Sequence, residues 1–183
     1  MDFNTTSRTF SAETEEKKSR FIAHLVPLSE FDETLEQLRH DHKKANHHAT
    51  AFRRMLENGQ IQEIGKDDGE PSGTSGMPVL KTMIGAGLMD AGIIVTRYFG
   101  GIKLGTGGLA RAYSGAANAV IEQADLVPWV QLGQRTLNVT FEQTAVIERQ
   151  IEQLGLTVVS RNYTETGVEM VVEGSSEAIA ALG

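Results

Sequence analysis

The sequence contains no cysteine and only 4 prolines, and aromatic residues make up only 6% of it. Without cysteine the chain can form no disulfide, no thiolate nucleophile and no cysteine-ligated zinc site, which fits a reducing compartment. It also lacks any apolar run near the roughly 20 residues that span a bilayer, and residues 1–20 are polar, with no apolar leader segment. These absences predict a soluble cytoplasmic protein that does not act at a membrane.

Acidic side chains outnumber basic ones, with 24 Asp and Glu against 17 Lys and Arg and a formal net charge of −7. This charge argues against a protein that coats nucleic acid by general electrostatic attraction, although a local basic patch stays open. Apolar residues make up 40% of the 183 residues. That share is ordinary for a globular protein and allows a packed core, in one large domain or two small ones.

The first part of the chain predicts a mixture of strands and helices. Ser29 and Asp32 have the spacing of a capping box that opens a helix, and a second, short helix is predicted over 77–88. An Asn-Gly pair within 58–60 predicts a hairpin turn. Apolar and alternating segments predict strands over 21–28, 47–56, 61–67 and 91–99.

The strongest helical pattern begins at Leu109 and runs to Ala124, with apolar residues three and four positions apart. A change in amino-acid composition after this helix predicts a division into two domains, residues 1–130 and 131–183. The second part reads strand, helix, strand, strand, helix. This order predicts a ferredoxin-like unit that lacks its last strand, so the whole chain is expected to be α+β.

A glycine-rich segment, VTRYFGGIKLGTGGLARAY (residues 95–113), joins a predicted strand to this helix. GTGGLA fits the G-x-G-x-x-A pattern of dinucleotide loops, but it lies too far after the strand, and Glu122 and Asp125 end the same helix rather than a second strand. No Gly-Lys-Ser/Thr follows, which excludes a Walker A loop. Two interpretations stay open: an anion site for phosphate at the helix N-terminus, or glycines that only allow close packing. The basic residues near this loop are Arg97, Lys103 and Arg111.

The loop DDGEPSGTSG carries the carboxylates of Asp67, Asp68 and Glu70. If the loop has a functional role, its carboxylates form a weak Mg²⁺ site or supply a general acid. If its role is only structural, it forms a turn followed by a helix cap from Thr74 or Ser75, and this second interpretation is favoured.

Two neighbouring histidines, His47 and His48, lie on a predicted strand. Adjacent strand residues point to opposite faces of a sheet, so this pair cannot hold one ion together. We expect one ring to be packed in the core and the other to be accessible.

Three segments, taken together and in this order, resemble the YigZ/IMPACT family: ANHHATAF, DDGEPSGTSG and VTRYFGGIKLGTGGLARAYSGA. The resemblance covers residues 19–125, and the trailing unit is similar to the small C-terminal domain of bacterial members. It implies an IMPACT N-terminal-like domain with the fold of the second domain of a small-subunit ribosomal protein. It also implies a C-terminal domain like the last domain of elongation factor G. Ala49 stands where family members often carry cysteine, and the chain ends before the expected last strand, so we expect a truncated C-terminus.

The resemblance further implies a patch built from the histidine, the acidic loop and the glycine loop. Eukaryotic relatives restrain a starvation-activated translation kinase by competing for its activator, and bacterial members are linked to translation by their fold. We therefore expect a non-enzymatic, translation-related regulator without a cofactor, which binds RNA, the ribosome or a translation-factor partner.

The alternative is an enzyme, either a hydrolase or a phosphotransferase. It would bind a phosphorylated substrate, with Mg²⁺ at the acidic loop and His47 moving protons. The resemblance also includes Gly69, Pro71 and Tyr113. The expected binding patch comprises His47, Asp67, Asp68, Glu70, Arg97, Tyr98, Gly100, Gly101, Lys103, Gly105, Gly107, Gly108 and Arg111.

Overall fold

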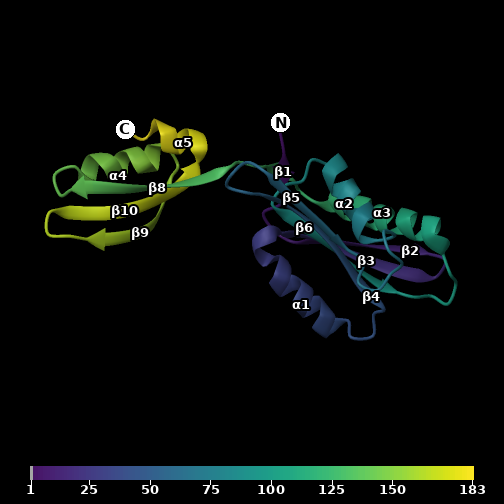
Figure 1. The fold of residues 1–183 in the computed structure, drawn as a ribbon. Helices are drawn as coiled ribbons and strands as arrows, with labels where there is room; N and C mark the ends of the chain where they lie inside the picture. The colour runs from purple at the N-terminus through teal and green to yellow at the C-terminus, as the bar shows by residue number, and fades with distance from the viewer. Residues whose placement is uncertain (1) are drawn as a thin grey trace. The chain divides into compact units, whose positions relative to one another are not determined.

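A computed structural model describes residues 2–183, and the chain divides into two compact units, Met1–Trp129 and Val130–Gly183. Each unit combines a β-sheet with α-helices around a hydrophobic core of its own, so the fold is a mixed α/β fold with two domains (Figure 1). Within residues 2–183, no helix has both the length and the apolar character needed to cross a membrane.

The first unit is built on a 5-stranded sheet in the order β2-β3-β6-β4-β5, in which all neighbouring strands are antiparallel. The strands predicted from apolar patterns are confirmed. The polar segment before them was not predicted to be a strand, yet it forms β2, because its alternating side chains suit an exposed edge of the sheet. The strands are β2 (Phe10–Glu16), β3 (Ser19–Pro27), β4 (His47–Met55), β5 (Ile61–Lys66) and β6 (Ala91–Tyr98).

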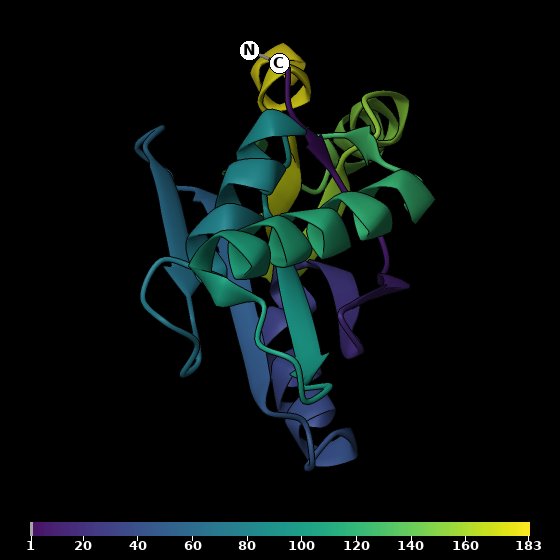
Figure 2. The same cartoon turned by 90° about the vertical axis from the view of Figure 1, so that its right-hand side faces the viewer.

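Helices cover both faces of this sheet. Figure 2 shows α2 (Gly76–Gly85) and α3 (Gly105–Gln123) lying across one face, and α1 (Phe31–Asp41) packs on the other. The larger core lies between the sheet and the α2/α3 pair and includes the fully buried Phe21 and Tyr113. Because β6 lies at the centre of the sheet and is covered on both faces, it is buried along almost its whole length and is apolar from Ala91 to Val95.

Two helix starts differ from the prediction. A 3-10 turn, η1 (Leu28–Glu30), precedes α1, and Glu30 occupies the N-cap without a side-chain hydrogen bond, so the capping box of Ser29 and Asp32 is wrong. The helix predicted to start at Leu109 starts earlier, at Gly105. Glycine has a low helix propensity, but the packing of the apolar stripe that follows extends α3 through its glycines.

The ends of the first unit are joined by a short pairing. β1 (Asn4–Thr5) pairs with β7 (Val127–Pro128) in an antiparallel ladder. The indole N–H of Trp129 then donates a hydrogen bond of 2.7 Å to the carboxylate of Asp90. Because the sequence contains 1 tryptophan, its fluorescence reports on the unfolding of this unit alone.

The second unit has the predicted element order. It consists of β8 (Leu132–Thr140), α4 (Thr144–Gln153), β9 (Thr157–Tyr163), β10 (Gly167–Ser175) and α5 (Ser176–Ala181). The sheet order is β8-β10-β9, with β10 antiparallel to both neighbours. Met170 and Val172 of β10 are fully buried at the centre of its small core.

The hairpin between β2 and β3 turns through two lysines. Glu16 pairs with Ser19, and between them Lys17 and Lys18 have φ angles of 46° and 66°. A two-residue turn of this kind needs positive φ at both positions, for which Asn-Gly is the favoured sequence. Lysine has no side-chain hydrogen bond to offset the left-handed conformation, so the turn is strained.

Replacing Lys17→Asn together with Lys18→Gly should raise the free energy of unfolding of the first unit by about 1 kcal/mol, because the strain is relieved. Urea unfolding followed by Trp129 fluorescence measures this change. The pair Lys17→Gln and Lys18→Gln removes the same charges without relieving the turn, and should not stabilise. An equal gain in both pairs would assign the effect to charge and not to backbone strain.

Histidines gather on the face of the sheet that α1 covers. Burial lowers the pKa of His24, and repulsion from His42 lowers it further. Burial also lowers the pKa of His48, with repulsion from Arg39 adding to it and Asp68 opposing it. His48 Nδ1 lies 2.9 Å from Thr96 Oγ1, whereas the buried Nδ1 of His24 has no hydrogen-bond partner in residues 2–183. Both rings are therefore better accommodated without charge.

Stability of the first unit should fall on acidification. The pKa of His24 in the folded chain is below the ordinary value of 6.5, so the unfolded chain binds protons more tightly. The contribution of neutral His24 to the free energy of unfolding is fully present above about pH 6.5. It is lost as pH falls from about 6.5 towards the lowered pKa of the folded state. Thermal unfolding by Trp129 fluorescence between pH 7.5 and pH 5 tests this. A His24→Leu variant should lose less stability over that interval, and a slope as steep as that of the wild type would contradict the assignment.

Candidate functional site

The predicted patch converges at one end of the 5-stranded sheet, on the face that α2 and α3 cover. His47 on β4 is paired with Arg97 on β6, and Arg97 is paired with Phe21 on β3. These residues continue the every-second-residue series of core positions on their strands, so their side chains point to the α2/α3 side. The acidic loop and the glycine loop meet them there: Glu70 contacts both Arg97 and His47, while Gly100 contacts Ser19 beside Arg97.

Glu70 lies at the centre of a buried polar network. Its side chain is 3% exposed, and its two oxygens accept hydrogen bonds of 2.7 and 2.9 Å from Nη1 of Arg97. The Arg97 side chain is itself only 6% exposed, and its Nη2 donates to Ser19 Oγ at 3.3 Å. A charge pair this deeply buried is stable only when its members are mutually hydrogen-bonded, as they are here.

Tyr113 of α3 provides a second donor to the same carboxylate. Its hydroxyl donates to Glu70 Oε2 at 2.5 Å, and its ring packs edge-on against Phe21, with centroids 5.2 Å apart. Burial raises the pKa of Tyr113 far above its ordinary value, and the bond to Glu70 raises it further. The phenol therefore remains protonated and acts as a fixed donor, not as a proton-transfer group.

His47 is held at both ring nitrogens. Nδ1 lies 2.8 Å from the backbone carbonyl of Asp68, and Nε2 lies 3.2 Å from Glu70 Oε1. Both partners are acceptors, so the ring satisfies both contacts when it carries a proton on each nitrogen. Both nitrogens are therefore already within hydrogen-bond distance of acceptors in the chain itself. Its neighbour His48 points to the opposite face, as predicted.

The carboxylates of the acidic loop point to different partners. Asp67 accepts hydrogen bonds from the N–H groups of Gly73, Ser75 and Gly76 and from Ser75 Oγ. Burial alone would raise the pKa of Asp67, but these donors hold it below its ordinary value. Asp67 therefore caps the N-terminus of α2. Ser75 occupies the N-cap position, as predicted, but its side chain makes no capping hydrogen bond.

Asp68 occupies the predicted turn, with φ +50°, followed by Gly69 with φ +87°. Its carboxylate accepts the N–H of His48 at 2.7 Å and lies 3.3 Å from Arg39 Nη2. Burial opposes ionisation, but the His48 N–H and Arg39 together hold the pKa of Asp68 below its ordinary value. Within residues 2–183, no group of three or more histidine or carboxylate side chains is arranged to hold a metal ion.

The glycines of the loop have different roles. A side chain at Gly100 would collide with the backbone of Lys18, so this glycine allows the loop to pack on the lysine hairpin. Gly105 has φ +74° and open space around it, so it serves the turn into α3. Gly107 lies beneath the Arg111 guanidinium, and Gly108 is close to Leu104. Packing accounts for Gly100, while the turn into α3 requires Gly105.

A pocket of about 430 Å³ opens beside this network. The end of the sheet contributes His47 and Arg97 to its wall, and the acidic loop contributes Glu70 and Pro71. Its other wall is the glycine loop and the first turn of α3, from Lys103 to Thr106. The pocket therefore joins the three segments that the sequence singled out.

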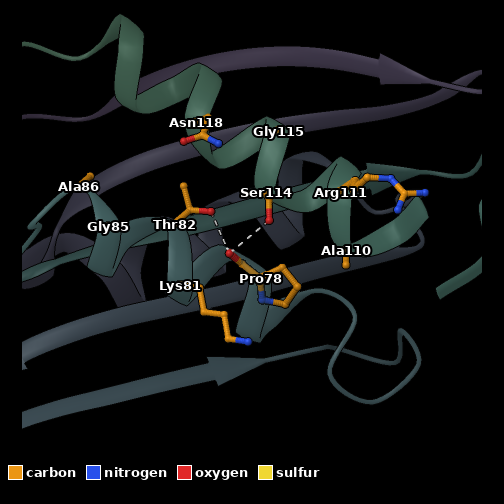
Figure 3. Close-up of a pocket in the computed structure, with 10 residues that line it drawn as sticks. All are labelled: Pro78, Lys81, Thr82, Gly85, Ala86, Ala110, Arg111, Ser114, Gly115 and Asn118. Carbon is orange, nitrogen blue, oxygen red and sulfur yellow. Dashed lines mark hydrogen bonds between the residues drawn. The ribbon is translucent and has the colours of Figure 1, made fainter. Parts of the chain in front are cut away.

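Five residues of the predicted patch line this pocket: His47, Glu70, Arg97, Lys103 and Gly105. The other eight do not line it, and two of these have their side chains at other places on the first unit. Tyr98 points to the α1 face, where its hydroxyl lies 2.6 Å from His42 Nδ1. Arg111 lines a separate groove of about 750 Å³ between α2 and α3, together with Lys81 and Ser114 (Figure 3). In that groove the Pro78 carbonyl accepts from Ser114 Oγ at 3.5 Å.

Two residues that hold the site together, Ser19 and Asn46, were not predicted, and of these Asn46 lines the pocket. Ser19 links Arg97 to the N–H of Gly100, at 3.3 and 3.2 Å. Asn46 Oδ1 accepts the N–H of Phe99 at 2.8 Å and so anchors the start of the glycine loop. Asn46 precedes His47 directly and could have been included on that ground, whereas Ser19 carries no local signal.

The Glu70 network should be a major source of stability in the first unit. Glu70→Ala leaves the buried Arg97 without its counter-charge and should cost about 3–5 kcal/mol of the free energy of unfolding. Tyr113→Phe removes one hydrogen bond to a charged group and should cost about 2 kcal/mol. Both are measured by urea unfolding with Trp129 fluorescence.

The control is Glu13→Ala, which removes a carboxylate from an exposed pair with Arg20, both side chains being about half exposed. This change should have no measurable effect. If Glu70→Ala were as mild as Glu13→Ala, the network would not be the structural centre of the site.

Known proteins match the whole of this arrangement. The model of the Impact N-terminal domain matches residues 17–121, which include the histidine, the acidic loop and the glycine loop. A solved structure described as that of a hypothetical protein is 30% identical and superposes with a TM-score of 0.78, covering 99% of this chain and 89% of its own.

Curated bacterial relatives extend the match. The IMPACT family member YigZ of Escherichia coli (strain K12) is 36% identical over 150 residues, which cover 80% of this chain and 74% of YigZ. The IMPACT family member YvyE of Bacillus subtilis (strain 168) is 35% identical over 152 residues, which cover 81% of this chain and 69% of YvyE. The chain therefore belongs to the IMPACT family.

Proposed function

We propose that this chain is a translation-related regulator that works by binding, and that the pocket beside Glu70 recognises its partner. Membership of the IMPACT family supports a role in translation, and the state of the polar side chains supports binding over catalysis. A role in translation would place the protein in the cytoplasm. RNA, the ribosome and a translation factor are the partners that such a role includes.

One observation carries the proposal: the side chains that could perform acid–base chemistry are held by their own chain. His47 is engaged at both nitrogens, Glu70 accepts from Arg97 and Tyr113, and Asp67 caps α2. A general base must be within reach of the proton it removes, and each of these groups is instead directed at a partner within the chain. Lys103 and the first turn of α3, in contrast, present donors to the pocket.

The architecture supports the same proposal. In the second unit, β8 and β9 are joined through α4, and β10 lies between them, as in the split β-α-β arrangement of ferredoxin-like domains. We infer that this unit has the fold of the last domain of elongation factor G. We infer likewise that the first unit has the fold of the second domain of a small-subunit ribosomal protein.

The proposal predicts that the protein sediments with ribosomes at low salt. Lys103→Glu should remove most of the sedimenting fraction, because it reverses an exposed charge at the pocket without disturbing the Glu70 network. The matched control, Lys81→Glu, reverses an exposed charge in the α2/α3 groove and should leave sedimentation unchanged.

The result that would contradict the proposal is a wild-type protein that stays in the supernatant with ribosomes and with ribosomal RNA. Turnover of a phosphorylated compound, dependent on Mg²⁺ and lost in a His47→Gln variant, would instead favour the enzymatic alternative.

A further inference from the structure

We propose that the pocket beside Glu70 binds a nucleotide unit of single-stranded RNA, with its phosphate between the first turn of α3 and Arg97, and its base on Phe99. This inference rests on the proposed function and names the chemistry that the same site recognises. It is carried by an unsatisfied buried donor, an uncapped helix N-terminus and an exposed aromatic ring, all of which belong to residues lining one pocket.

The first feature is the N-terminus of α3. The N-cap residue is Leu104, no side chain caps the helix, and no acidic residue lies in its first turn. The first N–H groups of a helix have no partner within it, and the helix dipole gives this end a partial positive charge. Gly105 and Thr106 of this turn line the pocket. An anion in the pocket would therefore meet N–H donors with little side-chain obstruction.

The second feature is independent of the helix. Arg97 lines the pocket, its side chain is 6% exposed, and Nη1 is fully used by Glu70. Nη2 makes only the long contact of 3.3 Å to Ser19, and the buried Nε has no hydrogen-bond partner among residues 2–183. A buried donor without an acceptor is costly. The Nε and Nη2 edge is also the fork that binds two oxygens of one phosphate.

Phe99 lies next to the guanidinium that carries this fork. The Arg97 guanidinium lies between two rings, with its carbon 5.6 Å from the centroids of both Phe21 and Phe99. Phe21 is fully buried, whereas Phe99 is 46% exposed and lines the pocket. Nε is closed to solvent in this conformation, so the proposal includes an outward turn of the exposed Phe99 ring as an oxyanion reaches it. A ring turned outward offers its face to a base.

Charge around the pocket favours an anion. Glu70 also lines the pocket, but its charge is matched by Arg97. Its oxygens accept from Arg97 and Tyr113, and Oε1 lies 3.2 Å from His47 Nε2. The exposed Lys103 then leaves the pocket wall positive. Asn46 adds a side-chain N–H₂ group, since its oxygen is already bound to the Phe99 N–H.

The combination selects a nucleotide over a bare anion or an acidic peptide. The pocket volume of about 430 Å³ exceeds what a phosphate needs and lies in the range of roughly 300–1,000 Å³ found for small-molecule sites. An exposed phenylalanine next to a cationic wall is the pairing by which proteins hold single-stranded nucleic acid, with bases stacked and phosphates neutralised. An acidic peptide would interact with the positive charges of the pocket but would leave the Phe99 ring without a stacking partner.

The test is a titration of ¹⁵N-labelled protein with four probes: the trinucleotide ApApA, adenosine, inorganic phosphate and hexaglutamate. ApApA should shift the Arg97 Nε–H signal and the amide signals of Gly105 and Thr106, and should bind more tightly than adenosine or phosphate. Lys103→Ala should weaken ApApA binding by roughly fivefold, as expected for one lost phosphate contact. Phe99→Ala should weaken it by roughly tenfold through lost stacking.

Lys81→Ala is the matched control and should leave all titrations unchanged. If hexaglutamate produces the shifts and ApApA does not, the occupant is an acidic protein segment and the inference is overturned. If none of the probes shifts these signals while the protein still sediments with ribosomes, the inference fails and the proposed function stands. If the wild-type protein binds ApApA as expected but does not sediment with ribosomes or ribosomal RNA, the proposed function is overturned instead.

Discussion

The carboxylate of Glu70 holds together segments that are far apart in the sequence. It binds Arg97 on the central strand, Tyr113 on α3 and His47 on β4, while lying itself in the loop between β5 and α2. Each partner comes from an element whose own packing is determined by apolar contacts. The carboxylate thus fixes the register between the loop, the sheet and the helix at the one end of the core where polar side chains replace apolar ones. The pocket exists because this network holds its walls apart.

Such a network is a costly way to stabilise a fold. Replacing a buried ion pair with apolar side chains of similar volume is often neutral or stabilising. An apolar cluster around Phe21 and the ring of Tyr113 could have closed this end of the core without any charge. The unsatisfied Nε of Arg97 and the strained lysine turn packed against Gly100 both lower the stability of the fold near this pocket. Strain and unsatisfied donors close to one pocket are typical of a binding site.

The sequence predicted the fold where periodicity is strong and the site only where its residues are neighbours. The strand over 91–99 and the helix beyond Leu109 follow from apolar spacing, because burial on a sheet or a helix face imposes it. β2 was missed because an edge strand with a polar face has little apolar signal. The acidic loop and the glycine loop were recognised as motifs, but the bond between Glu70 and Tyr113 joins residues separated by 43 positions. No spacing rule reaches that far. The residues alone therefore predict a turn or a metal site for this loop, and only the family resemblance places Glu70 and Tyr113 in one patch.

The acidic surface and the cationic pocket act together to make recognition selective. A net charge of −7 repels polyanions at long range, and at physiological ionic strength this repulsion is screened beyond about 8 Å. Only a group that enters the pocket comes close to the positive charge of Lys103 and to the N-terminus of α3. The Arg97 guanidinium lies next to the Phe99 ring at the same place. Binding must then depend on fit at one position and not on the number of phosphates in the strand. Its salt dependence should be shallow compared with that of a basic RNA-binding protein, because few counterions are displaced.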